Sequence, residues 1–592
     1  MPSQLPNPYE KFDAHRSEVR VGHGAAWWLT FVFLLLCLLP PFWRNANQFL
    51  QGENGWTPVI ELFRYAPGGD KTLRDHLREA ESQIENAEYT VAPRRVMQGL
   101  MTTTLREGNR KTAIGDEGWL YFRPAIDAVT GYGPLKAEPD TVAKDPNREP
   151  WNGPLDTILQ FNRQLEEFGA ELILMPIPVK PMIRPEHLTG KPSERPILHP
   201  DAERFYATLR EQGVEVLDLS DEWFAAAKEG EQVFLKQDTH WTSEMMQATA
   251  KRVSSFLKNQ AWFDEGWIDA ERFAAGEASE VSAPGDLLDN LELPGSLNPF
   301  SEESATVVPV KEGAELVSIY DQKSPIVLLG DSFTNIFHQK DMKWGEGAGF
   351  AEHLSLELGV GLDTIAQNGQ ASTGVRENLA NRPGAVILMK EKKAVIWAMA
   401  ARDLFLSETP ARAAGVKWDE VEFKDTPLPQ PGEAGPVRLR GKLTFKSPFL
   451  DPATAPYEAS VYAAEYEVEE VLDGNYDADT ALVFHWAFRN RKLEPAASFE
   501  EGDVRELTLV PMSEKSELQG INQANDSMRF ELVPYWADAV VSKTELSEDA
   551  IERASRIASI ATAVFSLLFG GVILGVYRRK RSLRASAAGT AN

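Results

Sequence analysis

Short apolar runs alternate with longer amphipathic stretches between residues 92 and 408 of this 592-residue chain. Four of the runs are typical of buried strands: residues 172–175, 214–217, 326–329 and 395–397. The stretches 155–168 and 202–212 instead place apolar residues at helical spacing. Strands that are apolar on both faces need helices above and below them, as in parallel sheets. The pattern therefore predicts a doubly wound, mostly parallel α/β domain.

A different pattern begins after residues 409–435, which contain four prolines and several glycines and are typical of a linker. Beyond the linker, apolar and polar residues alternate in five runs: residues 437–440, 461–471, 481–489, 504–510 and 528–535. A period of two, interrupted by turns, predicts a small antiparallel β-domain over residues 436–545. In its last run, Tyr535 and Trp536 can either stack on sugar rings or pack in the core, and we favour packing.

Two uncharged apolar stretches lie near the ends of the chain, at residues 25–43 and 557–577. Each is long enough to cross the roughly 30 Å hydrocarbon core of a bilayer. The tail 578–592 begins with Arg-Arg-Lys-Arg, and basic residues beside a span favour the cytoplasmic side. We therefore predict two transmembrane helices in the inner (cytoplasmic) membrane, with residues 1–24 and the tail in the cytoplasm. Residues 44–91 are predicted to be a helical spacer, and the main part of the chain faces the periplasm or exterior.

Charge and cysteine content exclude several classes of function. The formal net charge is −27, and because the basic tail contributes +5, the region between the two apolar stretches carries about −32. No basic stripe for nucleic acid is present, and a polyanionic polymer is repelled at long range. The single cysteine, Cys37, lies in the first apolar stretch, so the chain has no intramolecular disulfide and no thiolate zinc site. The sequence predicts no cofactor and no metal.

Two short motifs carry the chemistry of the predicted α/β domain. The run 326–329 ends in Gly330-Asp331-Ser332-Phe333, which places Ser332 at the edge of the sheet where open α/β folds bind their ligands. A serine hydroxyl needs a base in hydrogen-bond reach, and that base needs a third group to orient it. Asp238 and His240 are two residues apart, so both point the same way in an extended segment. Taken alone, however, Gly-Asp-Ser is a common turn, and Asp-x-His also serves in capping and in metal binding.

Between the two motifs, residues 265–310 are acidic and rich in Pro, Gly and Ser. We expect them to form an irregular excursion over one edge of the sheet. Asp331 lies beside Ser332, but adjacent residues on a tight turn seldom share a face, so we expect it to be structural. Trp241 is expected to pack behind His240.

The order of the motifs, Asp-x-His-Trp before Gly-Asp-Ser-Phe, resembles the SGNH-hydrolase-like domain of the alginate O-acetyltransferases, the AlgX/AlgJ group. Further segments are similar to that domain in the same order: residues 114–121, 176–180, 349–369, 393–397 and 402–404. The resemblance covers residues 92–408 and implies that Ser332 is the nucleophile, His240 the general base and Asp238 the group that orients it. It also implies transfer of an acetyl group to a polysaccharide through an acyl-serine, beside a membrane-bound O-acyltransferase that supplies acetyl groups.

Four further residues are candidates for oxyanion or substrate contacts. Asn368 and Gly369 follow the strand-like segment 363–366, although a plain Asn-Gly turn explains them equally well. Lys180, at a predicted strand end, either contacts substrate or is solvated. Arg402 either binds acceptor or forms an ion pair with a nearby aspartate, Asp403 or Asp321, and we favour the ion pair.

Three other functions use the same residues differently. An acetyl-esterase has the same triad and differs only in that water reaches the acyl-serine. A non-catalytic polysaccharide-binding assembly protein is a second possibility, although a binding module need not keep all three triad residues. A metal hydrolase that uses Asp238 and His240 with His338 or His353 is the third, and those later histidines lack ligand-type spacing.

Overall fold

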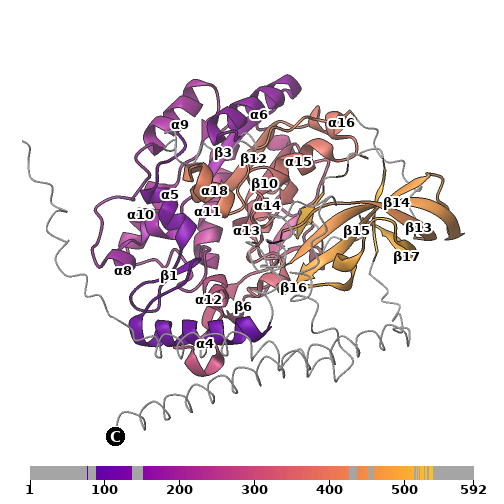
Figure 1. Ribbon diagram of the computed structural model, residues 1–592. Coiled ribbons are helices and arrows are strands. Elements are labelled where there is room, and N and C mark those ends of the chain that lie inside the picture. Colours follow the sequence, from indigo (N-terminus) through magenta and orange to yellow (C-terminus); the bar gives the residue numbers. More distant parts are fainter. Residues whose placement is uncertain are drawn as a thin grey trace, which may run out of the picture. The chain divides into compact units, whose positions relative to one another are not determined.

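The computed structural model describes residues 77, 88–135, 151–425 and 436–537, the last range with short gaps between 451 and 458 and between 513 and 531 (Figure 1). Both predicted membrane spans and the basic tail lie outside these residues, as does the predicted spacer except for residue 77 and the start of helix α4 (Glu88–Leu105). Within the described part, every helix is too short or too polar to cross a bilayer.

A five-stranded sheet forms the centre of the first domain (Figure 1). Its strands are β3 (Glu171–Ile177), β4 (Glu215–Val216), β10 (Ile326–Gly330), β11 (Asp363–Ala366) and β12 (Ala394–Ala400). They pair in the order β11-β10-β12-β3-β4, and every pair is parallel. All four predicted strands are present, and the predicted parallel sheet is confirmed.

Alternate residues of each strand face two separate hydrophobic cores. In β10, Ile326 and Leu328 pack into one core, whereas Val327 and Leu329 pack into the other. All four side chains are fully buried. A strand with two buried faces is apolar at every position, which is why these strands appear in the sequence as unbroken apolar runs.

Helices cover both faces of the sheet, so the fold is doubly wound. The face of Val327 is covered by α6 (Pro154–Phe168), α9 (Ala202–Glu211) and α15 (Gly374–Asn381). The opposite face is covered by α10 (Ser220–Lys228), α11 (Ser243–Lys258) and α14 (Phe350–Leu358). The predicted helices 155–168 and 202–212 thus agree with α6 and α9 to within one residue at each end.

Short helices complete the described part: α5 (Arg123–Thr130), α7 (Lys180–Ile183), α8 (Glu186–Thr189), α12 (Asp286–Leu291), α13 (Ser332–Asn335), α16 (Ala385–Met389), α17 (Ala401–Phe405) and α18 (Glu408–Ala413). Single turns of 3-10 helix are η1 (Glu265–Trp267), η2 (Gly295–Leu297), η3 (Lys340–Met342) and η4 (Pro495–Ser498).

Residues 265–310 are more regular than the sequence suggested. They hold β5 (Phe273–Ala275), β6 (Ser279–Ala283), α12 and β7 (Glu303–Val307), and are followed by β8 (Val310–Glu312) and β9 (Glu315–Leu316). β6 pairs with β7 and β5 with β8, both antiparallel. The expectation of an irregular excursion was therefore wrong, because short strands form between the Pro and Gly residues and three of the serines lie within those strands. A further antiparallel pair, β1 (Thr112–Ile114) and β2 (Leu120–Phe122), precedes the sheet.

The segment predicted as a linker, 409–435, is described up to residue 425, and this part packs against the α/β domain. Val416 and Trp418 are buried in the same core as α6. The Trp418 ring lies 5.9 Å from that of Trp397 in β12. The domain therefore extends to about residue 425 rather than ending at residue 408, because apolar residues inside the Pro- and Gly-rich stretch add to its core.

The β-domain consists of β13 (Val437–Lys446), β14 (Ser460–Asp473), β15 (Thr480–Arg489), β16 (Lys492–Leu493), β17 (Val504–Pro511), β18 (Asn522–Ala524) and β19 (Pro534–Trp536). Strands β15-β19-β17-β13-β14 pair in that order, and β14 pairs again with β15, which closes a five-stranded barrel. Most of these pairs are antiparallel, as predicted, but β19 runs parallel to β15 and β18 runs parallel to β14. Tyr535 and Trp536 are buried, which agrees with the packing interpretation.

Candidate functional site

Ser332 lies where β10 ends, at the carboxyl edge of the sheet. Gly330 closes the strand, and a Cβ on this residue would lie 2.2 Å from Thr334 Oγ1, so a side chain here would clash with Thr334 in α13. Asp331 then caps α13, because its Oδ1 accepts the Phe333 N–H at 2.8 Å. Its Oδ2 accepts the N–H of Ala400 at the end of β12, at 2.9 Å. Asp331 is thus structural, as expected, and it fixes the position of Ser332.

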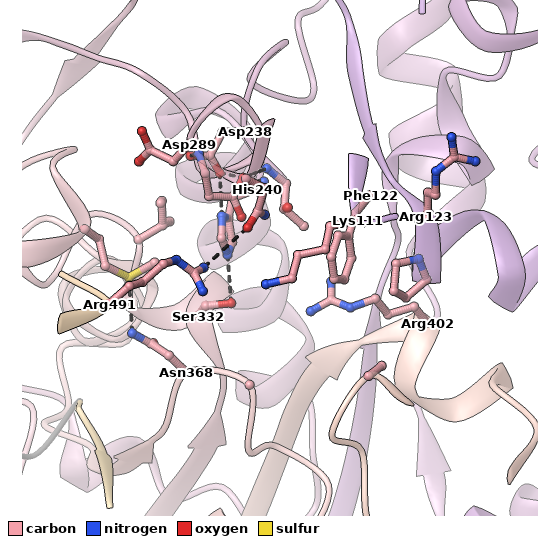
Figure 2. A pocket seen from close by; sticks show the side chains of 18 of the residues that line it. Lys111, Phe122, Arg123, Asp238, His240, Asp289, Ser332, Asn368, Arg402 and Arg491 are labelled. Atoms are coloured by element: carbon pink, nitrogen blue, oxygen red, sulfur yellow. Dashed lines mark hydrogen bonds and ion pairs between the residues drawn. The ribbon is translucent and has the colours of Figure 1, made fainter. Parts of the chain in front are cut away.

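The structure brings Asp238, His240 and Ser332 together (Figure 2). His240 Nε2 lies 2.8 Å from Ser332 Oγ, and His240 Nδ1 lies 2.5 Å from Asp238 Oδ1. The Asp238 and His240 residues are only 1% and 3% exposed, so water does not compete for these hydrogen bonds. The three side chains form a continuous hydrogen-bonded series that ends on a serine hydroxyl.

The backbone between Asp238 and His240 is not the extended segment that their spacing suggested. Residues 236–240 form a bend, and the His240 N–H donates to Asp238 Oδ1 at 3.1 Å. The aspartate side chain therefore folds back onto the backbone two residues later, a turn that Asp favours. The same oxygen accepts the ring N–H of His240, so one carboxylate oxygen orients both the backbone and the imidazole.

The second oxygen of Asp238 is held by two residues that sequence reasoning missed. Asp238 Oδ2 accepts the backbone N–H of Asp286 and the indole N–H of Trp344, each at 3.0 Å. Asp286 begins α12, and its own side chain accepts the Thr239 N–H at 2.6 Å. These partners are 48 and 106 residues from Asp238, and no local sequence signal indicates that they meet it.

Ionisation states follow from these contacts. Burial raises the pKa of Asp238, but the charge and hydrogen bond of His240, together with the two N–H donors on Oδ2, outweigh burial and leave the pKa below its ordinary value. Burial lowers the pKa of His240, and the charge of Asp238 more than compensates, so the pKa is raised. Burial and the charge of Asp238 raise the pKa of Asp286 to about 6. Asp238 is therefore a carboxylate at neutral pH.

Lys180 holds the loop that carries Asp238 rather than contacting a substrate. Its Nζ donates to the carbonyl oxygens of Leu120, Lys236 and Asp238 at 2.9, 3.0 and 2.6 Å. An ammonium group has three N–H donors, so all are used. The residue is 3% exposed, and burial lowers its pKa to about 8. Neither of the two predicted roles, a substrate contact or a solvated side chain, fits this buried lysine.

Asn368, Gly369 and Arg402 line the cavity in front of Ser332. Asn368 Oδ1 accepts from Asn335 Nδ2 at 2.9 Å, and its NH2 group makes only long contacts, to Gln339 Oε1 at 3.4 Å and to Met342 Sδ at 3.6 Å. Gly369 has a φ of 73°, a backbone conformation that favours glycine.

Arg402 also forms the ion pair that we favoured. Its Nε lies 3.4 Å from Asp403 Oδ1, and its guanidinium stacks over Phe122. Its Nη1 is buried and has no hydrogen-bond partner among the described residues. The other candidate partner, Asp321, pairs with Arg272 instead.

The cavity has a volume of about 540 Å³, and both domains contribute to its walls. Its cationic residues are Arg110, Lys111, Arg123, Lys343, Arg402 and Arg491. Ala459, Arg491 and Ile521 come from the β-domain. The triad thus opens onto a space large enough for a sugar ring, with several positive charges around it.

Asp238, His240 and Asp286 also lie close enough to share a metal ion. Both oxygens of Asp238 already accept N–H groups, however, so a cation would have to displace its hydrogen bonds. The alternative ligands are elsewhere, since His338 Nδ1 contacts Glu352 and His353 Nε2 contacts the Val308 carbonyl. The donor set suits an oriented imidazole better than a metal.

Comparison with known proteins gives consistent matches for the first domain. Residues 113–401 match the family described as the SGNH hydrolase-like domain of the acetyltransferase AlgX. The chain is 26% identical over 275 residues to the probable alginate O-acetylase AlgJ of Pseudomonas aeruginosa, covering 43% of this chain and 62% of that protein. It is 30% identical over 190 residues to the protein of the same name from Pseudomonas syringae, covering 32% and 43%. The matches thus span about half the length of these relatives.

Two solved structures are also similar. The O-acetyltransferase domain of Pseudomonas putida AlgJ aligns with a TM-score of 0.34 and 21% identity, covering 50% of this chain and 91% of that one. Pseudomonas aeruginosa AlgX aligns with a TM-score of 0.35 and 15% identity, covering 68% of this chain and 90% of that one.

Proposed function

We propose that this chain is a serine O-acetyltransferase that transfers an acetyl group to hydroxyls of a polysaccharide. The match of residues 113–401 to the SGNH hydrolase-like domain of the acetyltransferase AlgX supports this proposal. The observation that carries the proposal is the buried hydrogen-bonded series Asp238, His240 and Ser332, which opens onto a cavity at the carboxyl edge of the sheet. A module that only binds polymer does not need an imidazole oriented toward a serine hydroxyl.

In the first half-reaction, His240 Nε2 takes the proton of Ser332 as Oγ attacks the carbonyl carbon of the acetyl donor. The tetrahedral intermediate collapses, the donor's oxygen leaves with the proton from His240, and an acetyl-serine remains. In the second half-reaction, a sugar hydroxyl gives its proton to His240 and attacks the acyl carbon. Ser332 then recovers its proton, and the acetylated sugar leaves. Asp238 stays ionised throughout and stabilises the imidazolium.

The negative charge of each tetrahedral intermediate needs donors that are already in place. We assign this role to the Ser332 N–H, the Asn368 side-chain NH2 and the Gly369 N–H. The Asn368 amide is oriented by Asn335, which supports its assignment. In serine enzymes each such donor is worth roughly 3–4 kcal/mol of barrier.

Acceptor, partner and location complete the proposal. Alginate is the polymer in the relatives' names, so it is the first acceptor to test. We propose that residues 25–43 and 557–577 anchor the chain in the inner membrane with both domains outside the cytoplasm, as the apolar stretches and the basic tail indicate. The acetyl donor is then supplied across the membrane by a membrane-bound O-acyltransferase.

The experiment uses the purified full-length chain with a chromogenic acetyl ester and an oligosaccharide acceptor. We expect ester cleavage, one added acetyl group on Ser332 by peptide mass spectrometry, and acetylated oligosaccharide. Ser332→Ala should lose the adduct and at least about 10³-fold of the turnover. Retention of turnover by this variant would refute the assignment. Turnover without sugar acetylation indicates an esterase, and loss of turnover with a chelator would indicate a metal hydrolase.

A further inference from the structure

A hairpin of the β-domain reaches into the catalytic cavity. β15 ends at Arg489, which pairs with Lys492 at the start of β16, so the turn consists of Asn490 and Arg491 alone. Both residues have positive φ, 49° and 58°. This is the backbone of a tight hairpin turn whose second position is normally glycine. An arginine at this position is conformationally less favourable than glycine. It places a long cationic side chain at the tip of the hairpin.

Contacts from two sides hold the Arg491 guanidinium in the cavity wall. Nη1 donates to the carbonyl oxygens of Pro452 and Ala455 at 3.2 and 2.8 Å, within the β-domain. Nη2 donates to Oδ1 of Asn290, a residue of the catalytic domain, at 3.3 Å. Three of the five N–H donors are thus engaged, and no carboxylate among the described residues pairs with this side chain.

Other cations surround the same space. Figure 2 shows Lys111 and Arg402 pointing with Arg491 toward the region in front of Ser332. Burial lowers the pKa of Lys111 to about 8, and the charge of Arg491 contributes to this shift. The cavity is also lined by four acidic residues, Asp127, Asp238, Asp286 and Asp289, against six cationic ones. Two of the four are already paired, Asp289 with Lys343 and Asp238 with His240.

An arginine that lacks a counter-ion and faces other cations is an unfavourable arrangement in the free protein. A negatively charged ligand relieves it, because each charge-assisted hydrogen bond is roughly twice as strong as a neutral one. The net charge of −27 does not prevent this, because the Debye length at physiological ionic strength is only about 8 Å. The local cluster therefore decides what binds at the cavity.

We propose that Arg491 is a specificity-determining residue of the β-domain, which binds a negatively charged group of the acceptor sugar while Ser332 holds the acetyl group. The barrel then completes the acceptor site of the catalytic domain instead of binding carbohydrate on a separate surface. This inference rests on the acetyl transfer proposed above, but binding to Arg491 can be measured without turnover.

Binding is measured in full-length Ser332→Ala protein by calorimetry with three probes: a carboxylated oligouronate, a sulfated oligosaccharide and an uncharged cello-oligosaccharide. We expect Arg491→Ala to weaken binding of the preferred anionic probe about tenfold or more, because one charged hydrogen bond is lost. Binding of the uncharged probe should weaken less than about threefold. Arg491→Lys should recover part of the loss. The matched control is Arg438→Ala, a barrel cation outside the cavity that pairs with Glu506 and should change nothing.

Turnover provides a second readout in the active chain. Arg491→Ala should raise KM for the anionic acceptor more than it lowers kcat, whereas a structural role would lower kcat for all acceptors alike. The inference would be overturned if Arg491→Ala weakened binding of charged and uncharged probes equally, or if it weakened binding of neither anionic probe. If wild-type protein binds anions through Arg491 but transfers no acetyl group, the proposed function fails and the binding site stands.

Discussion

Asp238 is the residue on which the geometry of the site depends. It accepts N–H groups from the His240 ring, the His240 backbone, Asp286 and Trp344. These contacts keep it ionised and immobile at 1% exposure. Its charge in turn raises the pKa of His240 and selects the tautomer in which Nε2 accepts the proton of Ser332.

The pH dependence of turnover follows from the raised pKa of His240. The base must be neutral, so kcat/KM for the acetyl ester should fall on the acid side with a midpoint above 6.5, the ordinary value. Asp238→Asn removes the charge that raises this pKa and the acceptor that fixes the tautomer. We expect the acid midpoint to move down and turnover to fall about 10⁴-fold. An unchanged acid limb in this variant would contradict the pairing.

Trp344 offers a test of the contacts on Asp238 Oδ2. Trp344→Phe removes one hydrogen bond to a charged group, so we expect kcat/KM to fall about tenfold. Trp223→Phe is the matched control, because this fully buried indole belongs to the same core and its N–H has no hydrogen-bond partner among the described residues. Both variants should lose stability in chemical denaturation. If both lose activity equally, the Trp344 contact has no special role.

At the scale of elements, the site is assembled where separate segments meet at one edge of the sheet. β10 delivers Ser332, the bend at residues 236–240 delivers Asp238 and His240, and α12 places Asp286 against them. Lys180, in the short helix α7, connects the bend to strand β2, because it binds a carbonyl of β2 and two carbonyls of the bend.

Lys180→Met tests that connection. Removing the ammonium leaves three buried carbonyls without this donor. Each carbonyl that finds no other partner should lower the free energy of unfolding by about 1–3 kcal/mol. Because the bend also carries the triad, kcat should fall while KM for the acceptor stays within about twofold. Lys392→Met is the control, since Lys392 binds the Gln322 and Ser324 carbonyls and pairs with Asp363 at the opposite edge of the sheet. Lys392→Met should lower stability and leave kcat unchanged. A rise in acceptor KM as the main effect of Lys180→Met would restore the substrate role.

For the whole molecule, the described part combines a doubly wound α/β domain and a closed five-stranded barrel around one cavity. The five strands that close the barrel leave no free edge to which another strand could pair. The barrel therefore contacts the cavity through a hairpin tip. Arg491 lies at such a tip, which is how a separate domain supplies a cavity residue.

Topology is the prediction that belongs to the entire chain. A reporter active only outside the cytoplasm should be active when fused after Leu546 and silent after Arg584, both of which lie outside the described residues. The reason is the cost of moving the basic tail through the bilayer, roughly 2.5–3.5 kcal/mol per charge at its centre. Activity after Arg584 would overturn the two-span arrangement and leave the triad chemistry untouched.

The sequence by itself determined the strands of the central parallel sheet and the identity of the triad residues. A strand with two buried faces is apolar throughout, so the run 326–329 identified β10, and the residues that follow it identified Ser332. These features depend on neighbours in the chain, and local backbone geometry is enough to predict them.

Only the tertiary structure decided which groups Asp238, Lys180 and Arg491 contact. Trp344 and Asp286 reach Asp238, and Asn290 reaches Arg491, across 48 to 201 residues of sequence. The choice of a hydrogen-bond partner depends on how remote segments pack, because a buried donor bonds to whichever acceptor the fold brings within about 3 Å. The sequence left Lys180 as either a substrate contact or a solvated side chain, and packing decided that it supports the catalytic loop.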